Sequence, residues 1–95
     1  MILSENVQNA VKKLTQATTN EYTNYDGRRC LEFQFNSPKA DFAKLVEYKA
    51  DSNKYIIQFR KKDKLIYENF INPDDFSTVF EKVTGVSLDY YLNLF

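Results

Sequence analysis

The run KYIIQFRKKDKLIYENFI, residues 54–71, constrains the fold more than any other part of the sequence. Apolar and polar side chains alternate on both sides of a short basic bend. Tyr55, Ile57 and Phe59 share one face of the first half, and a period of two with one apolar face indicates a half-buried strand. Two such halves joined by a bend predict an antiparallel hairpin, so the chain must contain a sheet with one buried face.

The pairing of this hairpin follows from matching its apolar rows. We expect a loop of three or five residues centred on Lys62, which places Phe59 opposite Leu65 and Ile57 opposite Tyr67. A two-residue loop would shift one strand by one residue and mix the two faces. The aromatic rings predicted to point into the core are those of Tyr55, Phe59 and Tyr67.

A second hairpin is predicted over EYTNYDGRRCLEFQF, residues 21–35. Asp26 and Gly27 are typical of a two-residue turn, because both residue types tolerate a positive φ. Apolar and polar residues alternate again after that turn.

Between the hairpins, residues 38–50 combine a helical spacing of apolar residues with a strand-like alternation. We favour a strand there, and a helix capped by Ser37 is the alternative.

Apolar stripes with helical spacing predict helices at both ends of the chain. The first begins at Ser4, which can cap it, and its stripe is Val7, Ala10, Val11 and Leu14. The second, NPDDFSTVFEKVTG, is capped by Asn72 or Asp74, carries a stripe from Phe76 to Val83 and ends at Gly85. A short terminal helix follows Ser87.

These elements predict one α+β domain, residues 1–95. We expect an N-terminal helix, an antiparallel β-meander of four to five strands, a C-terminal helix and the short terminal helix, with the helices packed on one sheet face. The opposite face is expected to be mostly polar. The side chains expected on it are Glu32, Gln34, Glu47, Lys49, Ile56, Gln58, Ile66 and Glu68.

The amino-acid composition argues against most kinds of catalytic site. The chain has no histidine, so the usual general base near neutral pH is missing, and its two glycines cannot form a phosphate-binding loop. Cys30 has no second cysteine to pair with. The adjacent Arg28 and Arg29 could favour a reactive thiolate, but an ordinary thiol on a strand is the better interpretation. We therefore predict that the protein is not an enzyme and uses no cofactor or metal ion.

The N-terminal run MILSENVQNAVKK lacks the charged and then apolar order of a signal peptide, and no stretch is long and apolar enough to span a membrane. We expect a cytoplasmic protein with no membrane partner and no small-molecule substrate. The abundance of Asn, Lys, Tyr, Phe and Ile is typical of AT-rich coding, which favours a low-GC bacterium or its phages and mobile elements.

Charge separation favours a protein partner. The net charge is zero, yet residues 54–71 carry five basic and two acidic side chains, and residues 72–95 carry one basic and four acidic. Such separation suits a surface of complementary charge. We predict a small non-enzymatic protein-binding module, an inhibitor, adaptor or regulator, that binds another protein or itself as a homodimer. The candidate partner-binding residues are Ile56, Ile66, Tyr90, Tyr91, Leu94 and Phe95.

Two questions stay open at this point. The C-terminal YYLNLF is unusually apolar for a chain end, and it either closes the core or forms an interface. The basic bend is either a solvated hairpin tip or a nucleic-acid site that contacts phosphates. The residues of the nucleic-acid alternative are Arg60, Lys61, Lys62 and Lys64, joined by Arg28 and Arg29 if both hairpin tips lie at one end of the sheet.

The helix–meander–helix layout and the run YDGR after the first helix resemble the small Alu-domain subunits of the signal recognition particle. The turn-strand-turn-strand run into the last helix is similar as well. The resemblance implies a sheet that binds RNA. Those subunits are strongly basic, whereas this chain has no net charge, and no residue roles are transferred.

Overall fold

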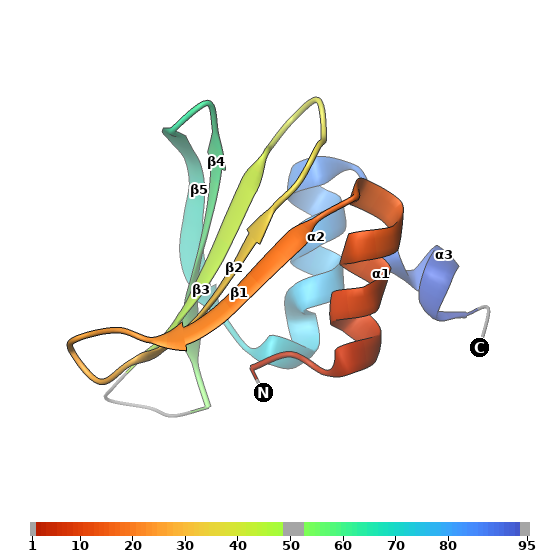
Figure 1. The fold of residues 1–95 in the computed structure, drawn as a ribbon. Coiled ribbons are helices and arrows are strands. Elements are labelled where there is room, and N and C mark those ends of the chain that lie inside the picture. The colour runs from red at the N-terminus through yellow and green to blue at the C-terminus, as the bar shows by residue number, and fades with distance from the viewer. Residues whose placement is uncertain (1, 49–52, 94–95) are drawn as a thin grey trace.

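A computed structural model describes residues 2–48 and 53–93 and shows the predicted α+β class. Helix α1 (Glu5–Thr15) precedes five strands, which are followed by the 3₁₀ turn η1 (Pro73–Asp75) and the helices α2 (Phe76–Thr84) and α3 (Leu88–Leu92). The strands are β1 (Thr18–Thr23), β2 (Arg29–Gln34), β3 (Phe42–Glu47), β4 (Tyr55–Lys61) and β5 (Lys64–Ile71). They form one antiparallel sheet in chain order, and the helices lie on one side of it (Figure 1).

Residues 42–47, in the segment for which both a strand and a helix were considered, form strand β3. Residues 49 and 50 of that segment lie outside the described residues. A strand fits at this place because each connection of the meander is short and joins neighbouring strands, so no crossover helix is needed. The alternative of a helix capped by Ser37 is wrong.

Helix α1 begins as predicted, since the Ser4 hydroxyl oxygen accepts a hydrogen bond from the Val7 N–H at 3.3 Å. Its buried stripe differs at the C-terminal end. Leu14 is 36% exposed, and Thr15 is buried in its place. The Thr15 hydroxyl donates to the Val11 carbonyl at 2.6 Å, so burying it leaves no unsatisfied polar group.

Helix α2 packs against the sheet through two phenylalanines. Asn72 accepts from the Asp74 N–H at 3.0 Å and caps η1, which leads into the helix. Phe76 and Phe80 are fully buried, and Gly85 ends the helix with a φ of 78°, where a glycine avoids steric strain.

The covered face of the sheet is a continuous apolar layer. One cross-strand row runs through Phe33, Ala43, Phe59 and Tyr67, and the next runs through Leu31, Leu45 and Ile57. The Phe33 and Phe76 ring centroids are 5.8 Å apart, and those of Phe59 and Phe80 are 6.0 Å apart. The predicted inward direction of Tyr55, Phe59 and Tyr67 is therefore confirmed.

The predicted register of the β4–β5 hairpin is wrong by two residues. Phe59 pairs with Tyr67 rather than Leu65, and Ile57 pairs with Asn69. The turn has only two residues, Lys62 and Asp63, both with positive φ. A β-bulge beside it adds one residue to β5, which restores the match of the apolar rows.

The β1–β2 hairpin is confirmed, but its turn is longer than predicted. Asn24 and Arg28 close the loop through a backbone hydrogen bond of 2.9 Å, and only Gly27 within it has a positive φ. The Asn24 side chain accepts from the N–H groups of Asp26 and Arg28 at 3.0 Å each. An asparagine that bonds its own turn replaces the two-residue turn predicted at Asp26 and Gly27.

Candidate functional site

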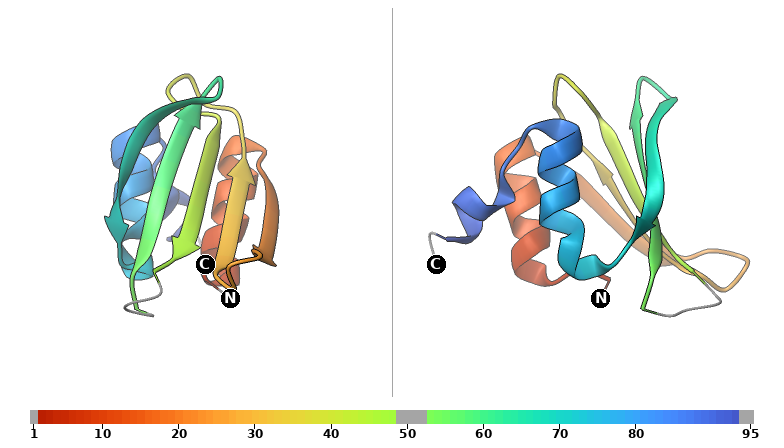
Figure 2. Two further views of the ribbon diagram at one scale, coloured as in Figure 1. Left: turned by 90° about the vertical axis from the view of Figure 1, so that its left-hand side faces the viewer. Right: turned by 180° about the vertical axis from the view of Figure 1, so that it is seen from behind.

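The face of the sheet away from the helices is uncovered within residues 2–48 and 53–93 (Figure 2, left). Three cross-strand rows of side chains point to this open face. The register defines them as Thr18–Gln34–Phe42–Arg60–Leu65, Asn20–Glu32–Lys44–Gln58–Glu68 and Tyr22–Cys30–Val46–Ile56–Phe70. The first two rows are mostly polar, and the third is mostly apolar.

The third row and its neighbour Tyr48 form an apolar surface, which we call the open-face patch: Tyr22, Val46, Tyr48, Ile56 and Phe70. Phe70 is 56% exposed, and its ring meets the Tyr48 ring edge-on at a centroid distance of 5.1 Å. The other members are half-buried. Aromatic and aliphatic side chains that stay partly exposed together on one face are typical of a binding surface.

Cys30 lies in the same row, yet it is fully buried. Its thiol is 3.7 Å from the Arg28 carbonyl oxygen. The neighbouring Arg28 Nε is also buried and has no hydrogen-bond partner among the described residues. Larger side chains therefore cover the thiol, which fits the predicted structural role of Cys30 better than a reactive one.

Tyr22 lies at the border of the open-face patch, where Glu32 of the neighbouring row holds its ring in place. Its phenol donates a hydrogen bond to Glu32, and that carboxylate also lies 3.8 Å from the Lys44 ammonium. The hydrogen bond to Glu32 is the main cause that raises the pKa of Tyr22, followed by partial burial. The ring is therefore held in place as a neutral phenol.

Beside the β4–β5 turn, the open face forms a shallow concavity of about 650 Å³. Phe42 lies in its lining with the basic residues Lys44 and Arg60 and the acidic residues Asp41 and Asp63. Arg60 donates to the Asp63 carbonyl at 3.1 Å, and the Asp41 carboxylate accepts from the Lys62 N–H at 3.0 Å. The acidic residues of this concavity thus offset much of its basic charge.

The basic candidates do not form one surface. Arg28 and Arg29 follow the β1–β2 turn, which lies at the opposite end of the sheet from the β4–β5 turn that carries Lys62 (Figure 1). The condition for a joint basic patch therefore fails. Lys61 donates to the Ser37 carbonyl at 2.9 Å, whereas Lys62 and Lys64 are exposed.

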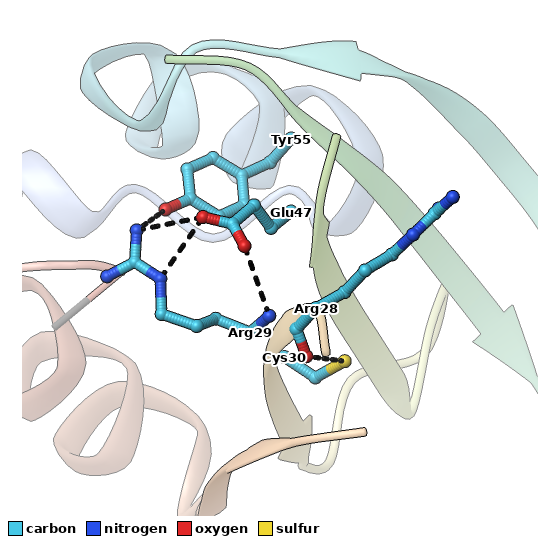
Figure 3. A network of polar contacts seen from close by, with 5 residues as sticks. All are labelled: Arg28, Arg29, Cys30, Glu47 and Tyr55. Carbon is cyan, nitrogen blue, oxygen red and sulfur yellow. Dashed lines mark hydrogen bonds and ion pairs between the residues drawn. The ribbon is translucent and has the colours of Figure 1, made fainter. Parts of the chain in front are cut away.

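Arg29 is held by an ion pair on the helix-covered side (Figure 3). Its guanidinium lies 3.2 Å from the Glu47 carboxylate and donates to the Tyr55 hydroxyl at 3.0 Å. Glu47 was expected on the open face, but it shares a row with Arg29 and Tyr55. The Glu47 carboxylate is tolerated on this side because its ion pair with Arg29 compensates its partial burial.

Tyr90 and Tyr91, the C-terminal candidates among the described residues, lie away from the open face. Tyr90 is 71% exposed on α3, and α3 packs against α1 on the helix side. Tyr91 is half-buried against the core, which favours core closure for that residue. Leu94 and Phe95 lie outside the described residues, so the role of the complete YYLNLF segment stays a prediction.

Comparison of the chain with protein-family models, with curated proteins and with solved structures gave no match. The likeness to the Alu-domain subunits therefore stays one of element order.

No helix within the described residues has both the length and the apolar character needed to cross a membrane. In the same residues, no three side chains of the His, Cys, Asp and Glu types are grouped so that they could hold a metal ion.

Of the open-face patch, the sequence interpretation found only Ile56; its other β-strand candidate, Ile66, is exposed on β5 but lies outside the patch. Phe70 shares a face with Glu68 in either register, so alternation could also have identified it; the bulge determines only that it lies opposite Ile56. The alternation of Val46 and Tyr48 with Lys44 was a signal in the sequence that could have identified two more members.

Proposed function

We propose that the protein is a small non-enzymatic module that binds another protein through the open-face patch. It acts in the cytoplasm as an inhibitor, adaptor or regulator. The single observation that carries the proposal is the exposure of Phe70 at 56%, in contact with Tyr48 and beside Ile56 on a face that no described helix covers. A few residues supply most of the binding energy in protein interfaces, and aromatic side chains are enriched there.

The surroundings of the patch support a protein partner. Glu32, Lys44, Gln58 and Glu68 lie in the neighbouring row and provide a polar border. An apolar centre with a polar rim is the common anatomy of a protein–protein interface. Tyr22 and Tyr48 add rings with polar hydroxyls, which suit contact with both apolar and polar groups.

The test is quantitative affinity capture from an extract of the native host, followed by mass spectrometry. We compare the wild type with Phe70→Ser and with Tyr90→Ser, which removes an exposed ring from the helix side. A protein recovered by the wild type and by Tyr90→Ser, but lost with Phe70→Ser, supports the proposal. Calorimetry with that purified protein should then show the same order of affinities.

Two results would contradict this function. Equal recovery with all three proteins would mean that the open-face patch makes no specific contact. Loss with Tyr90→Ser alone would place the interface on α3. Circular dichroism of each variant confirms that the fold is intact before capture.

A second candidate function, nucleic-acid binding, is favoured by the position of Phe42 between Lys44 and Arg60 in the concavity beside the exposed Lys62 and Lys64. An aromatic ring between cations can stack on a base while the cations contact phosphates. Tyr55 and Tyr67 do not serve this role, because they face the helices.

Salt dependence distinguishes the two functions. If phosphates are contacted, the logarithm of the affinity for duplex DNA falls with the logarithm of salt, with a slope of about −0.9 for each phosphate. Changing Lys62 and Lys64 to Ala together should flatten that slope by roughly two such contacts. Absence of a gel shift on DNA and RNA at low salt would eliminate the nucleic-acid function.

A further inference from the structure

Strand β5 is an edge of the sheet, and its outer side has no neighbouring strand in the part of the chain that the structure describes (Figure 2). It is among the longest strands, and six of its eight residues are exposed. Edge strands present unpaired backbone N–H and C=O groups that can pair with another chain. Proteins commonly shorten or twist such edges, and here the bulge beside the turn affects only the first half of the strand.

The hydrogen-bond alternation shows which backbone groups of β5 point outward. The Tyr48 N–H donates to the Lys54 carbonyl at 3.0 Å, so these two opposite residues are a hydrogen-bonded pair. In an antiparallel ladder every second pair is hydrogen-bonded, so Val46 of β3 and Ile56 of β4 are the next such pair. The backbone groups of Ile56 therefore point to β3 and away from β5.

Phe70 is the partner of Ile56 on β5, so its N–H and C=O point away from β4. Consistent with this, the Phe70 N–H donates to the side-chain oxygen of Asn69 at 2.8 Å rather than to the sheet. Glu68 lies two residues earlier and has the same outward direction. The second half of β5 can therefore accept a further antiparallel or parallel strand.

The side chains along this edge specify what such a strand must carry. Leu65 and Ile66 are each 42% exposed, and Phe70 is 56% exposed. Glu68 lies between them, accepts a hydrogen bond from Gln58 and makes no ion pair with a described cation. An incoming strand would gain from apolar residues beside Phe70 and Ile66 and from a cation beside Glu68.

The position of Glu68 disfavours the self-pairing of two copies that places their apolar residues opposite each other. In an antiparallel pairing of two β5 strands that matches Ile66 with Phe70, the two Glu68 carboxylates lie directly opposite each other. Like charges in that position destabilise strand pairing, and charged residues on edges commonly prevent self-association.

We propose that β5 recognises its protein partner by β-strand addition, and that the partner strand carries a lysine or arginine between two apolar residues at alternate positions. This inference rests on the proposed protein-binding function and specifies how the partner is held. The Glu68 backbone and the Phe70 carbonyl supply the hydrogen bonds, the Glu68 carboxylate selects the cation, and the open-face patch receives the apolar side chains.

The experiment uses two synthetic peptides, one containing Val-Thr-Lys-Thr-Val and the other Val-Thr-Glu-Thr-Val, titrated into the full chain and followed by NMR. We expect the lysine peptide to shift the amide signals of Glu68 and Phe70, and to bind several-fold more tightly than the glutamate peptide. The variant Glu68→Lys should reverse that preference. Absence of shifts in β5 with the lysine peptide would overturn the proposal.

A matched pair of variants separates the backbone from the side chain. Glu68→Ala keeps the outward N–H, whereas Glu68→Pro removes it, and proline is tolerated on an edge strand where the N–H faces solvent. Glu68→Pro should bind the lysine peptide roughly fivefold more weakly than Glu68→Ala, the effect of one lost hydrogen bond. Equal affinities would overturn strand addition.

Two further outcomes keep this proposal distinct from the broader one. If a captured partner depends on Phe70 but binds Glu68→Pro and Glu68→Ala equally, strand addition is wrong and the open-face patch stands. If the amide signals of β5 shift with protein concentration in the absence of peptide, the occupant is a second copy, which overturns the proposed partner.

Discussion

The two faces of this sheet are built from the same strands but differ in what their apolar side chains contact. On the covered face, Phe33 and Phe59 are fully buried against Phe76 and Phe80. On the open face, Phe70 contacts Tyr48 and remains 56% exposed. Burial of a ring stabilises the fold, whereas an exposed ring retains most of its apolar surface for another molecule.

The largest loss of stability is expected from a substitution on the covered face. Phe59→Ala removes a ring that packs on both Phe80 and Tyr67, so it should lower the free energy of unfolding by about 3–5 kcal/mol. Urea denaturation followed by circular dichroism measures this. A loss under about 1 kcal/mol would mean that the helices do not seal this face.

A much smaller effect is expected from Phe70→Ser on the open face. The ring contacts Tyr48 but is mostly exposed, so the free energy of unfolding should fall by about 1 kcal/mol or less. The same denaturation experiment checks it. A loss as large as that of Phe59→Ala would show that Phe70 belongs to the core, and its role in binding would then be untenable.

The smallest effect concerns Tyr22 at the edge of the open-face patch, and it depends on pH. Its folded pKa is raised by the hydrogen bond to Glu32, so the folded state retains a proton that the unfolded chain loses above the usual tyrosine pKa of about 10. This contribution is complete below that pH and disappears as pH rises beyond it.

The variant Tyr22→Phe isolates that contribution from the other tyrosines. Between about pH 9 and pH 11, the wild type should lose more stability than Tyr22→Phe, as measured by urea midpoints. Parallel pH profiles for the two proteins would contradict the proposed hydrogen bond.

The difference between the faces also explains what the sequence could predict. The inward positions of Tyr55, Ile57 and Phe59 follow from period-two alternation, and the capping residues Ser4 and Gly85 follow from local chemistry. These features depend on neighbours in sequence, so the fold class and these two helix ends were predictable.

The pairing of Ile56 with Phe70 in the open-face patch was not predictable because it depends on register. The turn at Lys62 and Asp63 adopts positive φ at two residues without glycine, and the Asp41 carboxylate helps to hold it. An apolar-row match without a bulge gives another pairing, in which Phe70 is not opposite Ile56. A long-range contact and a bulge thus determine how β5 pairs with β4, and neither has a local sequence signal.

The most direct test of the account compares two adjacent isoleucines on β4. Ile57 is fully buried on the covered face, and Ile56 is half-buried on the open face. Ile57→Ala should lower the free energy of unfolding by about 2–5 kcal/mol, and Ile56→Ala by about 1 kcal/mol or less. Equal losses from the two substitutions in urea denaturation would show that both faces are core, which contradicts a free surface for a partner.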